Sequence, residues 1–196
     1  MAKVEWKHRV PSPHDAFLDR PDAKLEYNRL HFSEAARHYD LGTKMLSLGR
    51  DASWKRQLVD ALPEEPATAL DLACGTGDIC FLLAERFPKA SIEGLDLTRE
   101  MIEIAEGRNH FGERVGFVQG DICNLAYNDG SKELITGSYA LRNAPDLSRA
   151  VQEIHRVLRP GGVAAFLDFS KSVSRGVQTI QYWALRVWGG LWGLLL

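Results

Sequence analysis

The chain has 196 residues, of which 45% are hydrophobic and 26% are charged, and its formal net charge is −2. This length and composition predict one soluble globular domain with a substantial core, no electrostatic basis for nucleic-acid binding and no membrane-spanning helix. Its three cysteines form no Cys-x-x-Cys pair, which indicates reduced thiols, a cytoplasmic protein and no metal site.

The N-terminal region is expected to precede the main fold. Residues 1–27 are polar and interrupted by prolines, which favours an irregular surface arm. From residue 28 to about residue 60 the pattern is helical, with interruptions near Gly42 and Gly49. We therefore expect residues 1–60 to form an N-terminal arm and helical lid, and residues 61–196 to form the main domain.

Strand and helix patterns then alternate along the chain. Strands are expected at residues 68–73, 91–96, 115–118, 133–139 and 162–169. The helical patterns between them include residues 78–87, a segment opened by Thr98, and residues 147–158, where Pro160-Gly-Gly162 stops the helix. Such alternation is typical of βαβ units, so the expected fold class is α/β with a doubly wound, mainly parallel, Rossmann-like sheet.

A glycine turn, Gly75-Thr-Gly77, follows the first expected strand. The strand contains Asp71, and Asp78 opens the helical pattern after the turn. A strand that leads into such a turn lets a ligand approach bare backbone and unpaired N–H groups. A dinucleotide site normally has a third glycine or an alanine where this chain has Cys80, which disfavours NAD. Two carboxylates suit a ligand with cationic character, such as S-adenosylmethionine (SAM).

Acidic residues also follow the second and third expected strands. Asp96 lies where it would bind the two hydroxyls of a ribose. Asp121 lies where it would accept a hydrogen bond from an adenine amino group, with Ile122 packed on the ring. Each acid has an ordinary alternative: Asp71 satisfies loop amides, Asp96 caps a helix, and Asp121 belongs to a polar turn. Their order at successive strand ends favours a nucleoside site, because ligands of such sheets bind at that edge.

The order of the glycine turn, Asp96 and Asp121 resembles that of class I SAM-dependent methyltransferases. From about residue 32 onward the chain is more narrowly similar to the C-methyltransferases of ubiquinone and menaquinone biosynthesis. The motifs that carry this resemblance are Phe32-Ser, Tyr39-Asp40, Ser47-Leu-Gly49, Trp54-Lys-Arg56, Leu141-Arg-Asn143, Leu158-Arg-Pro-Gly-Gly162 and Asp168-Phe-Ser-Lys171. The chain departs from the family pattern at Thr43, Lys132-Glu133 and Ala144-Pro-Asp146.

The resemblance implies SAM-dependent methylation of a ring carbon of a prenylated quinol. It implies that Arg142 and Asn143 face the acceptor ring, where a guanidinium stabilises a phenolate and Arg142 orders a water that removes the proton. The ordinary alternative for Arg142 is a structural ion pair. The candidate cofactor-binding residues are Asp71, Gly75, Thr76, Gly77, Asp96, Leu97, Asp121, Ile122 and Ser138. Tyr39 and Trp54 are expected to cover the site as substrate and lid residues, with helix packing as their alternative.

Other functions and partners stay open at this point. The acceptor of a related enzyme would be a phenol, amine or thiol, and a shortened paralogue would bind SAM without turnover. The resembled fold has seven strands and five are readable here, so the last two are expected to be missing. The Trp- and Leu-rich tail from residue 183 is interpreted as a packing helix weakened by glycines. Contact of that tail with a polyprenyl chain or, peripherally, with a membrane surface, and a homodimer, are the remaining alternatives.

Overall fold

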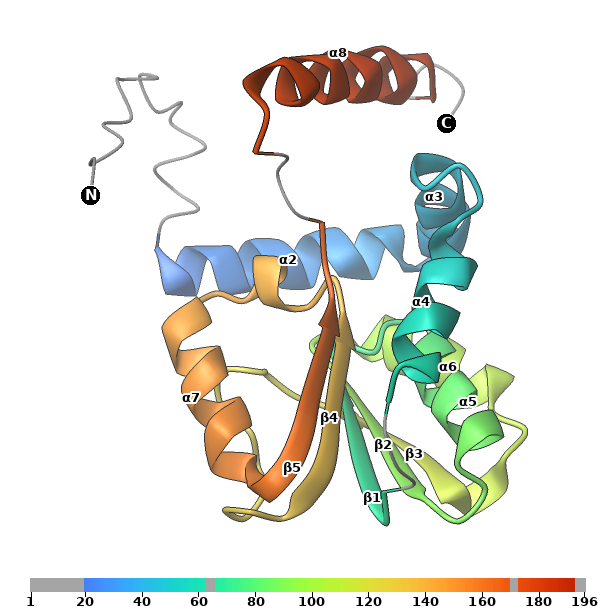
Figure 1. Ribbon diagram of the computed structural model, residues 1–196, viewed down its shortest axis with the longest axis vertical. Helices are drawn as coiled ribbons and strands as arrows, with labels where there is room; N and C mark the ends of the chain where they lie inside the picture. Colours follow the sequence, from blue (N-terminus) through green and yellow to red (C-terminus); the bar gives the residue numbers. More distant parts are fainter. Residues whose placement is uncertain (1–19, 63–65, 170–172, 193–196) are drawn as a thin grey trace.

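The computed structural model describes residues 20–62, 66–169 and 173–192 of the chain. These residues form a five-stranded sheet with strand order β3-β2-β1-β4-β5, and every pairing in it is parallel (Figure 1). The strands are β1 (Thr68–Leu72), β2 (Ser91–Asp96), β3 (Val115–Gln119), β4 (Lys132–Ser138) and β5 (Leu158–Leu167). The doubly wound α/β fold predicted from the sequence is confirmed.

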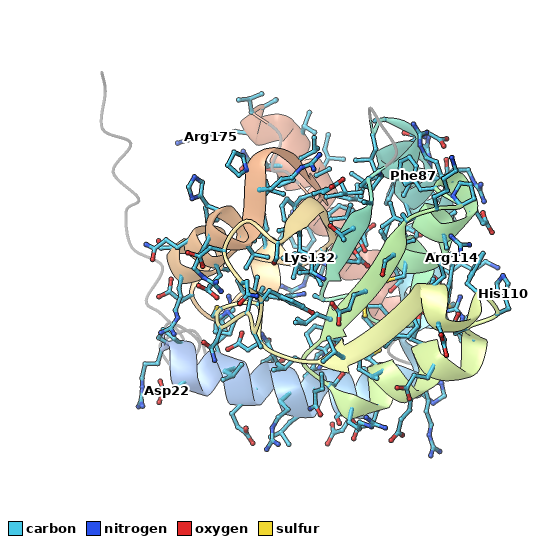
Figure 2. The ribbon with its side chains drawn as sticks, turned by 90° about the horizontal axis from the view of Figure 1, so that it is seen from below. Asp22, Phe87, His110, Arg114, Lys132 and Arg175 are labelled. Carbon is cyan, nitrogen blue, oxygen red and sulfur yellow. The ribbon has the colours of Figure 1, made fainter. Side chains whose placement is uncertain are left out.

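Helices cover both faces of the sheet (Figure 1). Those on one side are α4 (Asp51–Asp60), α5 (Asp78–Arg86) and α6 (Arg99–Arg108), and α7 (Leu147–Val157) lies on the other side. Helix α2 (Pro21–Ala35) crosses the edge where the strands end, and Figure 2 shows it beside α6, starting near Asp22. Single 3-10 turns occupy Ala36–His38, Gly112–Arg114 and Leu141–Asn143.

The strands supply side chains to a separate hydrophobic core on each face. Ala69 and Ile92 pack into the core that contains α4 and α5, whereas Leu70 and Ile135 pack into the core that contains α7. All four side chains are buried. Successive residues of a strand point to opposite faces, so a parallel sheet covered on both sides needs apolar residues at consecutive positions.

The N-terminal helix begins earlier than the sequence pattern predicted. Helix α2 starts at Pro21, within the stretch expected to be an irregular arm, while residues 1–19 lie outside the described residues. Pro21 occupies the first turn, where its missing N–H has no cost, and Asp22 complements the positive end of the helix dipole. These local signals outweigh the polar composition that suggested an arm.

The two glycines of the helical preface behave differently. Gly42 lies inside α3 (Tyr39–Leu46), so the interruption predicted there is wrong. The interruption near Gly49 is confirmed, because Leu48 and Gly49 have φ values of 54° and 78° and separate α3 from α4. Glycine adopts this left-handed conformation at no steric cost, which explains why the chain turns there.

Strand β5 also begins earlier than expected. Helix α7 ends at Val157, and β5 starts at the next residue and runs through Pro160-Gly-Gly162, with an irregular register opposite Lys132. Proline cannot continue a helix, and it disfavours helical backbone at the residue before it. The helix therefore ends before the Pro-Gly-Gly turn, and the strand includes that turn.

The last described element is α8 (Arg175–Trp192), which contacts α3. It continues through Gly189 and Gly190, two of the glycines expected to weaken a helix there, while residues 193–196 lie outside the described part. Ile180 and Trp183 are exposed on α8. In the described ranges no strand follows β5, and no helix is both long and apolar enough to cross a membrane.

Candidate functional site

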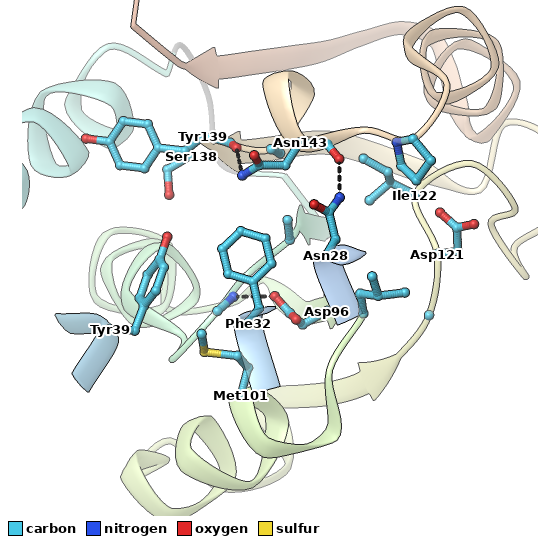
Figure 3. A pocket seen from close by; sticks show the side chains of 16 residues that line it. Asn28, Phe32, Tyr39, Asp96, Met101, Asp121, Ile122, Ser138, Tyr139 and Asn143 are labelled. Atoms are coloured by element: carbon cyan, nitrogen blue, oxygen red, sulfur yellow. Dashed lines mark hydrogen bonds between the residues drawn. The ribbon is translucent and has the colours of Figure 1, made fainter. Parts of the chain in front are cut away.

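A cavity lies where the strands end, beneath α2 and α3 (Figure 3). We call it the strand-end cavity. Its empty space, counted together with its open mouth, is about 600 Å³. Its lining residues are Asn28, Phe32, Tyr39, Ala73, Gly75, Asp96, Leu97, Met101, Gly120, Asp121, Ile122, Ser138, Tyr139, Ala140, Asn143 and Pro145.

The glycine turn forms one wall of this cavity. Gly75 and Gly77 have φ values of 55° and 90°, a region that side chains disfavour. A Cβ on Gly77 would also lie 2.9 Å from the ring of Phe81. Gly75 lines the cavity, whereas Gly77 sets the start of α5 and does not line it. The two predicted glycines therefore differ in what they place at the cavity.

Asp96 follows from β2 directly into the cavity wall. Its Oδ2 accepts a hydrogen bond from the Gly75 N–H at 2.8 Å, and its Oδ1 accepts from the N–H and hydroxyl of Thr98 at 3.0 Å each. Burial raises the pKa of Asp96 despite these bonds. These bonds come from the glycine turn and from the start of α6, so they hold the carboxylate beside the cavity. The side chain thus both shapes the turn and lines the cavity.

Asp121 and Ile122 line the cavity at the end of β3, and Ser138 lines it at the end of β4. The Oδ1 of Asp121 accepts a hydrogen bond from the Cys123 N–H at 2.8 Å, which fixes the local turn. Leu97 completes this predicted set. In Figure 3, Asp96 and Asp121 lie on separate parts of the cavity wall with Ile122 beside Asp121. The structure therefore brings together the acids predicted at successive strand ends.

Asp71 lies elsewhere, beneath the turn. It is 1% exposed and does not line the cavity. Its carboxylate accepts hydrogen bonds from the Thr136 hydroxyl at 2.8 Å and the Cys80 thiol at 3.7 Å. Burial raises its pKa to about 7. The sequence-based expectation that Asp71 contacts a ligand is corrected here, because its oxygens face Thr136 of β4 and Cys80 of α5.

Asp78 does not act as a free negative charge. Its Oδ2 lies 2.9 Å from Lys55 Nζ, and its Oδ1 lies 2.7 Å from Arg108 Nη2. Burial alone would raise the pKa of Asp78, but the two cations outweigh it and lower the pKa. The attraction of a cationic ligand by Asp71 and Asp78 therefore stays a prediction, and Asp78 lines the small recess beside Gly75. The acids that reach the cavity are Asp96 and Asp121.

The hydroxyl and the carbonyl of Thr76 both have partners on neighbouring helices. Its hydroxyl donates to Asp40 Oδ1 at 2.8 Å, and its carbonyl accepts from Arg108 at 2.9 Å. It is 3% exposed and lines a small polar recess beside Gly75, next to the strand-end cavity. Thr76 therefore ties the turn to α3 and reaches a ligand only through that recess.

A second cavity adjoins the first on the side of α2 and α3. We call it the lid cavity. Arg142 and Asn143 line it, and Arg142 Cζ lies 4.9 Å from the ring centre of Tyr139 and 5.2 Å from that of Phe169. Arg142 Nε is 3.7 Å from Asp168 Oδ1, so the predicted structural ion pair is also present. The residues shared by the two cavities are Asn28, Phe32, Tyr39, Tyr139 and Asn143.

The two predicted lid residues have different positions. Tyr39 lines both cavities, and burial raises the pKa of its hydroxyl. Trp54 lines neither, and its ring packs edge-on against Phe169 with centroids 5.9 Å apart. The alternative of packing therefore describes Trp54, which supports one wall of the lid cavity from behind.

Asn28 and Tyr139 are among the lining residues that the sequence analysis did not predict. Asn28 is 7% exposed, and its amide donates to the Asn143 carbonyl at 2.7 Å, but nothing marks it in the pattern of α2. Tyr139 is 3% exposed and has φ of 60°, which is unusual for an aromatic residue. Its position two residues before Leu141-Arg-Asn143 is the one available signal.

The chain matches the ubiE/COQ5 methyltransferase family over residues 22–191. It is 41% identical to a demethylmenaquinone methyltransferase of Thermus thermophilus over 70% of its own length and 64% of the relative's. It is 38% identical to a 2-phytyl-1,4-naphtoquinone methyltransferase of Thermosynechococcus vestitus over 80% of its own length and 71% of the relative's.

The fold is also similar to that of a solved methyltransferase. The crystal structure of an S-adenosylmethionine-dependent methyltransferase from Mesorhizobium loti has a TM-score of 0.52 and 31% identity, covering 59% of this chain and 52% of that one. The chain spans a little under two thirds of the Thermus relative, at 64% of its length. With a family match over most of its residues and the sheet and cavities described above, the chain belongs to the ubiE/COQ5 methyltransferase family.

Proposed function

We propose that the chain catalyses SAM-dependent methyl transfer to a ring carbon of a prenylated quinol. The observation that carries this proposal is the pair of adjoining cavities. The strand-end cavity presents acids and apolar side chains, and the lid cavity presents aromatic rings and the Arg142 guanidinium. Tyr139 and Asn143 lie in the wall that both share, so ligands in the two cavities would meet there.

The strand-end cavity fits the nucleoside part of SAM. Asp96 presents its carboxylate to a ribose hydroxyl at the cavity wall, and Asp121 and Ile122 offer an acceptor and an apolar surface for adenine. The Gly75 backbone allows close approach on the other side. When bound, SAM supplies an electrophilic methyl group. The predicted contacts of Leu97 and Ser138 agree with their place in the lining.

The lid cavity supports the expected role of Arg142 toward an acceptor ring. Methyl transfer to an aromatic carbon requires high electron density at that carbon, which a neighbouring phenolate oxygen supplies. A guanidinium stabilises the phenolate form. The rings of Tyr139 and Phe169 hold Arg142 in place, and Asn143 is held by donating to the Tyr139 carbonyl at 3.0 Å. The contribution of the chain is then orientation of two ligands and stabilisation of one negative charge.

The relatives favour a quinol acceptor, since both names given above describe methylation of a quinone. The described part of the predicted lid, residues 20–60, would close the two cavities over the main domain. Support for this division comes from α2, where Lys24 donates to the Ala144 carbonyl at 2.7 Å and Asn28 to the Asn143 carbonyl. The lid is thus attached to the loop that carries Arg142.

The test has two stages. Calorimetric titration of the 196-residue chain with SAM measures cofactor binding, and transfer of a labelled methyl group is then compared between demethylated quinols and simple phenols, amines and thiols. We expect the chain to bind SAM. We expect a labelled product to form only when the acceptor is a quinol. Absence of SAM binding would refute the enzyme proposal, and faster methylation of a simple phenol, amine or thiol would refute the quinol acceptor.

A further inference from the structure

A row of buried polar groups connects the shared cavity wall to α4. The Tyr139 hydroxyl donates to Asp51 Oδ1 at 2.8 Å, and Asp51 Oδ2 lies 2.6 Å from Lys55 Nζ. Lys55 Nζ in turn lies 2.9 Å from Asp78 Oδ2 at the start of α5. Figure 3 shows the Tyr139 ring at the wall with its hydroxyl directed away from Asn143. We call the Asp51–Lys55 pair the strut.

Beyond the strut, contacts of the more exposed Arg108 and Asp40 continue to the glycine turn. Arg108 binds Asp78 at 2.7 Å and the Thr76 carbonyl at 2.9 Å, and it lies 3.3 Å from Asp40 Oδ2. Asp40 accepts the hydrogen bond from the Thr76 hydroxyl. Each group in the row faces a partner of opposite charge or a donor. The wall of the lid cavity is therefore joined to the turn of the strand-end cavity by one continuous set of contacts.

Both side chains of the strut are buried. Asp51 is 9% exposed and Lys55 is 6% exposed. Burial alone would lower the pKa of Lys55, but the charges of Asp78 and Asp51 outweigh it and raise the pKa, so the lysine is charged. A buried ion pair is often no more stabilising than apolar residues of similar volume, because its charges lose hydration. The strut is therefore better explained by what it positions than by stability alone.

Tyr139 is the residue that the strut holds. Its φ of 60° lies in the left-handed region, which is strained for an aromatic residue and persists only when the surroundings enforce it. Its N–H donates to the Leu167 carbonyl at 2.7 Å, and its ring stacks on Phe169 with centroids 5.0 Å apart. The bond to Asp51 fixes the remaining end of the side chain.

We propose that the Asp51–Lys55 strut is a positioning device that fixes Tyr139 relative to the glycine turn and thereby couples ligand binding in the strand-end cavity to binding in the lid cavity. This inference rests on the proposed function. Tyr139 lines both cavities, so a ligand in either one contacts the side chain whose far end the strut holds. Coupling requires one element that both ligands contact, and Tyr139 is among the residues that line both cavities.

The experiment measures binding of S-adenosylhomocysteine, which carries no transferable methyl group, with and without a short-chain demethylnaphthoquinol under anaerobic conditions. The coupling is the ratio of the two dissociation constants. Tyr139→Phe keeps the ring and removes only the hydroxyl that reaches Asp51. Tyr127→Phe is the matched control, because the Tyr127 oxygen is buried without a hydrogen-bond partner among the described residues and lies outside both cavities.

We expect the quinol to tighten S-adenosylhomocysteine binding by about tenfold in the native chain and in Tyr127→Phe. In Tyr139→Phe the ratio should fall to about one, and this ratio is compared within the variant so that a change in its affinity for S-adenosylhomocysteine alone does not enter. Lys55→Gln, which removes the cation of the strut, should reduce the ratio similarly. A purely structural role would lower the melting temperature and leave the ratio unchanged.

The outcomes separate the two proposals. If S-adenosylhomocysteine does not bind the native chain, the proposed function fails and this inference fails with it. If it binds, but the native ratio is one or Tyr139→Phe keeps the native ratio, the strut is not a coupling device and the proposed function stands.

Discussion

The side chain of Asp71 lies beneath the glycine turn, where burial raises its pKa to about 7 from an ordinary 3.8. Between these values the folded chain holds a proton that the unfolded chain has lost. The free energy of unfolding contributed by this group is therefore complete below about pH 4 and is lost as the pH rises toward 7. This is the reverse of the usual behaviour of a carboxylate in an ion pair.

Asp71→Asn should remove this pH dependence. The amide oxygen can still accept from the Thr136 hydroxyl, and no ionised form exists to be buried. We expect the variant to gain more than about 1 kcal/mol of unfolding free energy relative to the native chain between pH 5 and pH 8. Urea denaturation of both proteins at the two pH values measures it, and a difference independent of pH would contradict the raised pKa.

Arg142→Ala should separate turnover from cofactor affinity. The guanidinium lines the lid cavity and not the strand-end cavity, so SAM affinity should change by less than about twofold. Loss of a charge that stabilises a phenolate should lower kcat/KM for the quinol by about 100-fold. Arg159→Ala, which removes a half-exposed partner of Glu133, is the control for a lost surface charge. Equal losses of affinity and turnover would argue against the assigned role.

At the scale of elements, α7 anchors the loop that follows Asp121. Arg156 donates to the Leu125 carbonyl at 2.8 Å and to the Tyr127 carbonyl at 2.7 Å. Glu153 accepts from the Leu125 N–H at 2.8 Å, and the hydrogen bonds from Arg156 lower the pKa of Glu153 to about 2. This helix therefore supplies the hydrogen bonds that the irregular loop backbone lacks.

Arg156→Met should lower the free energy of unfolding more than Arg159→Met does, because two carbonyls lose charged donors. Arg159→Met removes one arginine of the same region whose ion pair is partly exposed, and it should cost less than about 1 kcal/mol. Chemical denaturation measures both. Equal effects of the two changes would show that the loop carbonyls gain nothing from Arg156.

The elements with strong local signals could be predicted from the sequence, and the roles of single acids could not. Strand β2 occupies Ser91–Asp96 as expected, and the acid that ends it lines the cavity. Asp71 has the same local pattern of an acid among apolar residues, yet it faces Thr136. Only the packing of β1 against β4 decides between these outcomes, and that packing joins residues 65 positions apart.

The same limit explains the N-terminal part of the site. The side chains of Lys24 and Asn28 bind carbonyls of residues 142–144, which lie more than 100 positions away. Neither residue has a periodic or motif signal of its own, so the sequence predicted a lid without the contacts that place it. At the scale of the whole molecule, the two cavities therefore lie between the N-terminal helices α2 and α3 and segments that come much later in the chain.

This arrangement predicts where a ligand protects the backbone. A ligand in the strand-end cavity would contact Asn28, Phe32 and Tyr39 from above and the glycine turn from below, so it should hold α2 and α3 against the sheet. Hydrogen exchange with saturating S-adenosylhomocysteine should slow in residues 21–46 and 73–77. Helix α7 lines neither cavity and serves as the internal control. Protection confined to the turn, with α2 and α3 unchanged, would mean that the N-terminal helices pack on the domain without closing over its ligand.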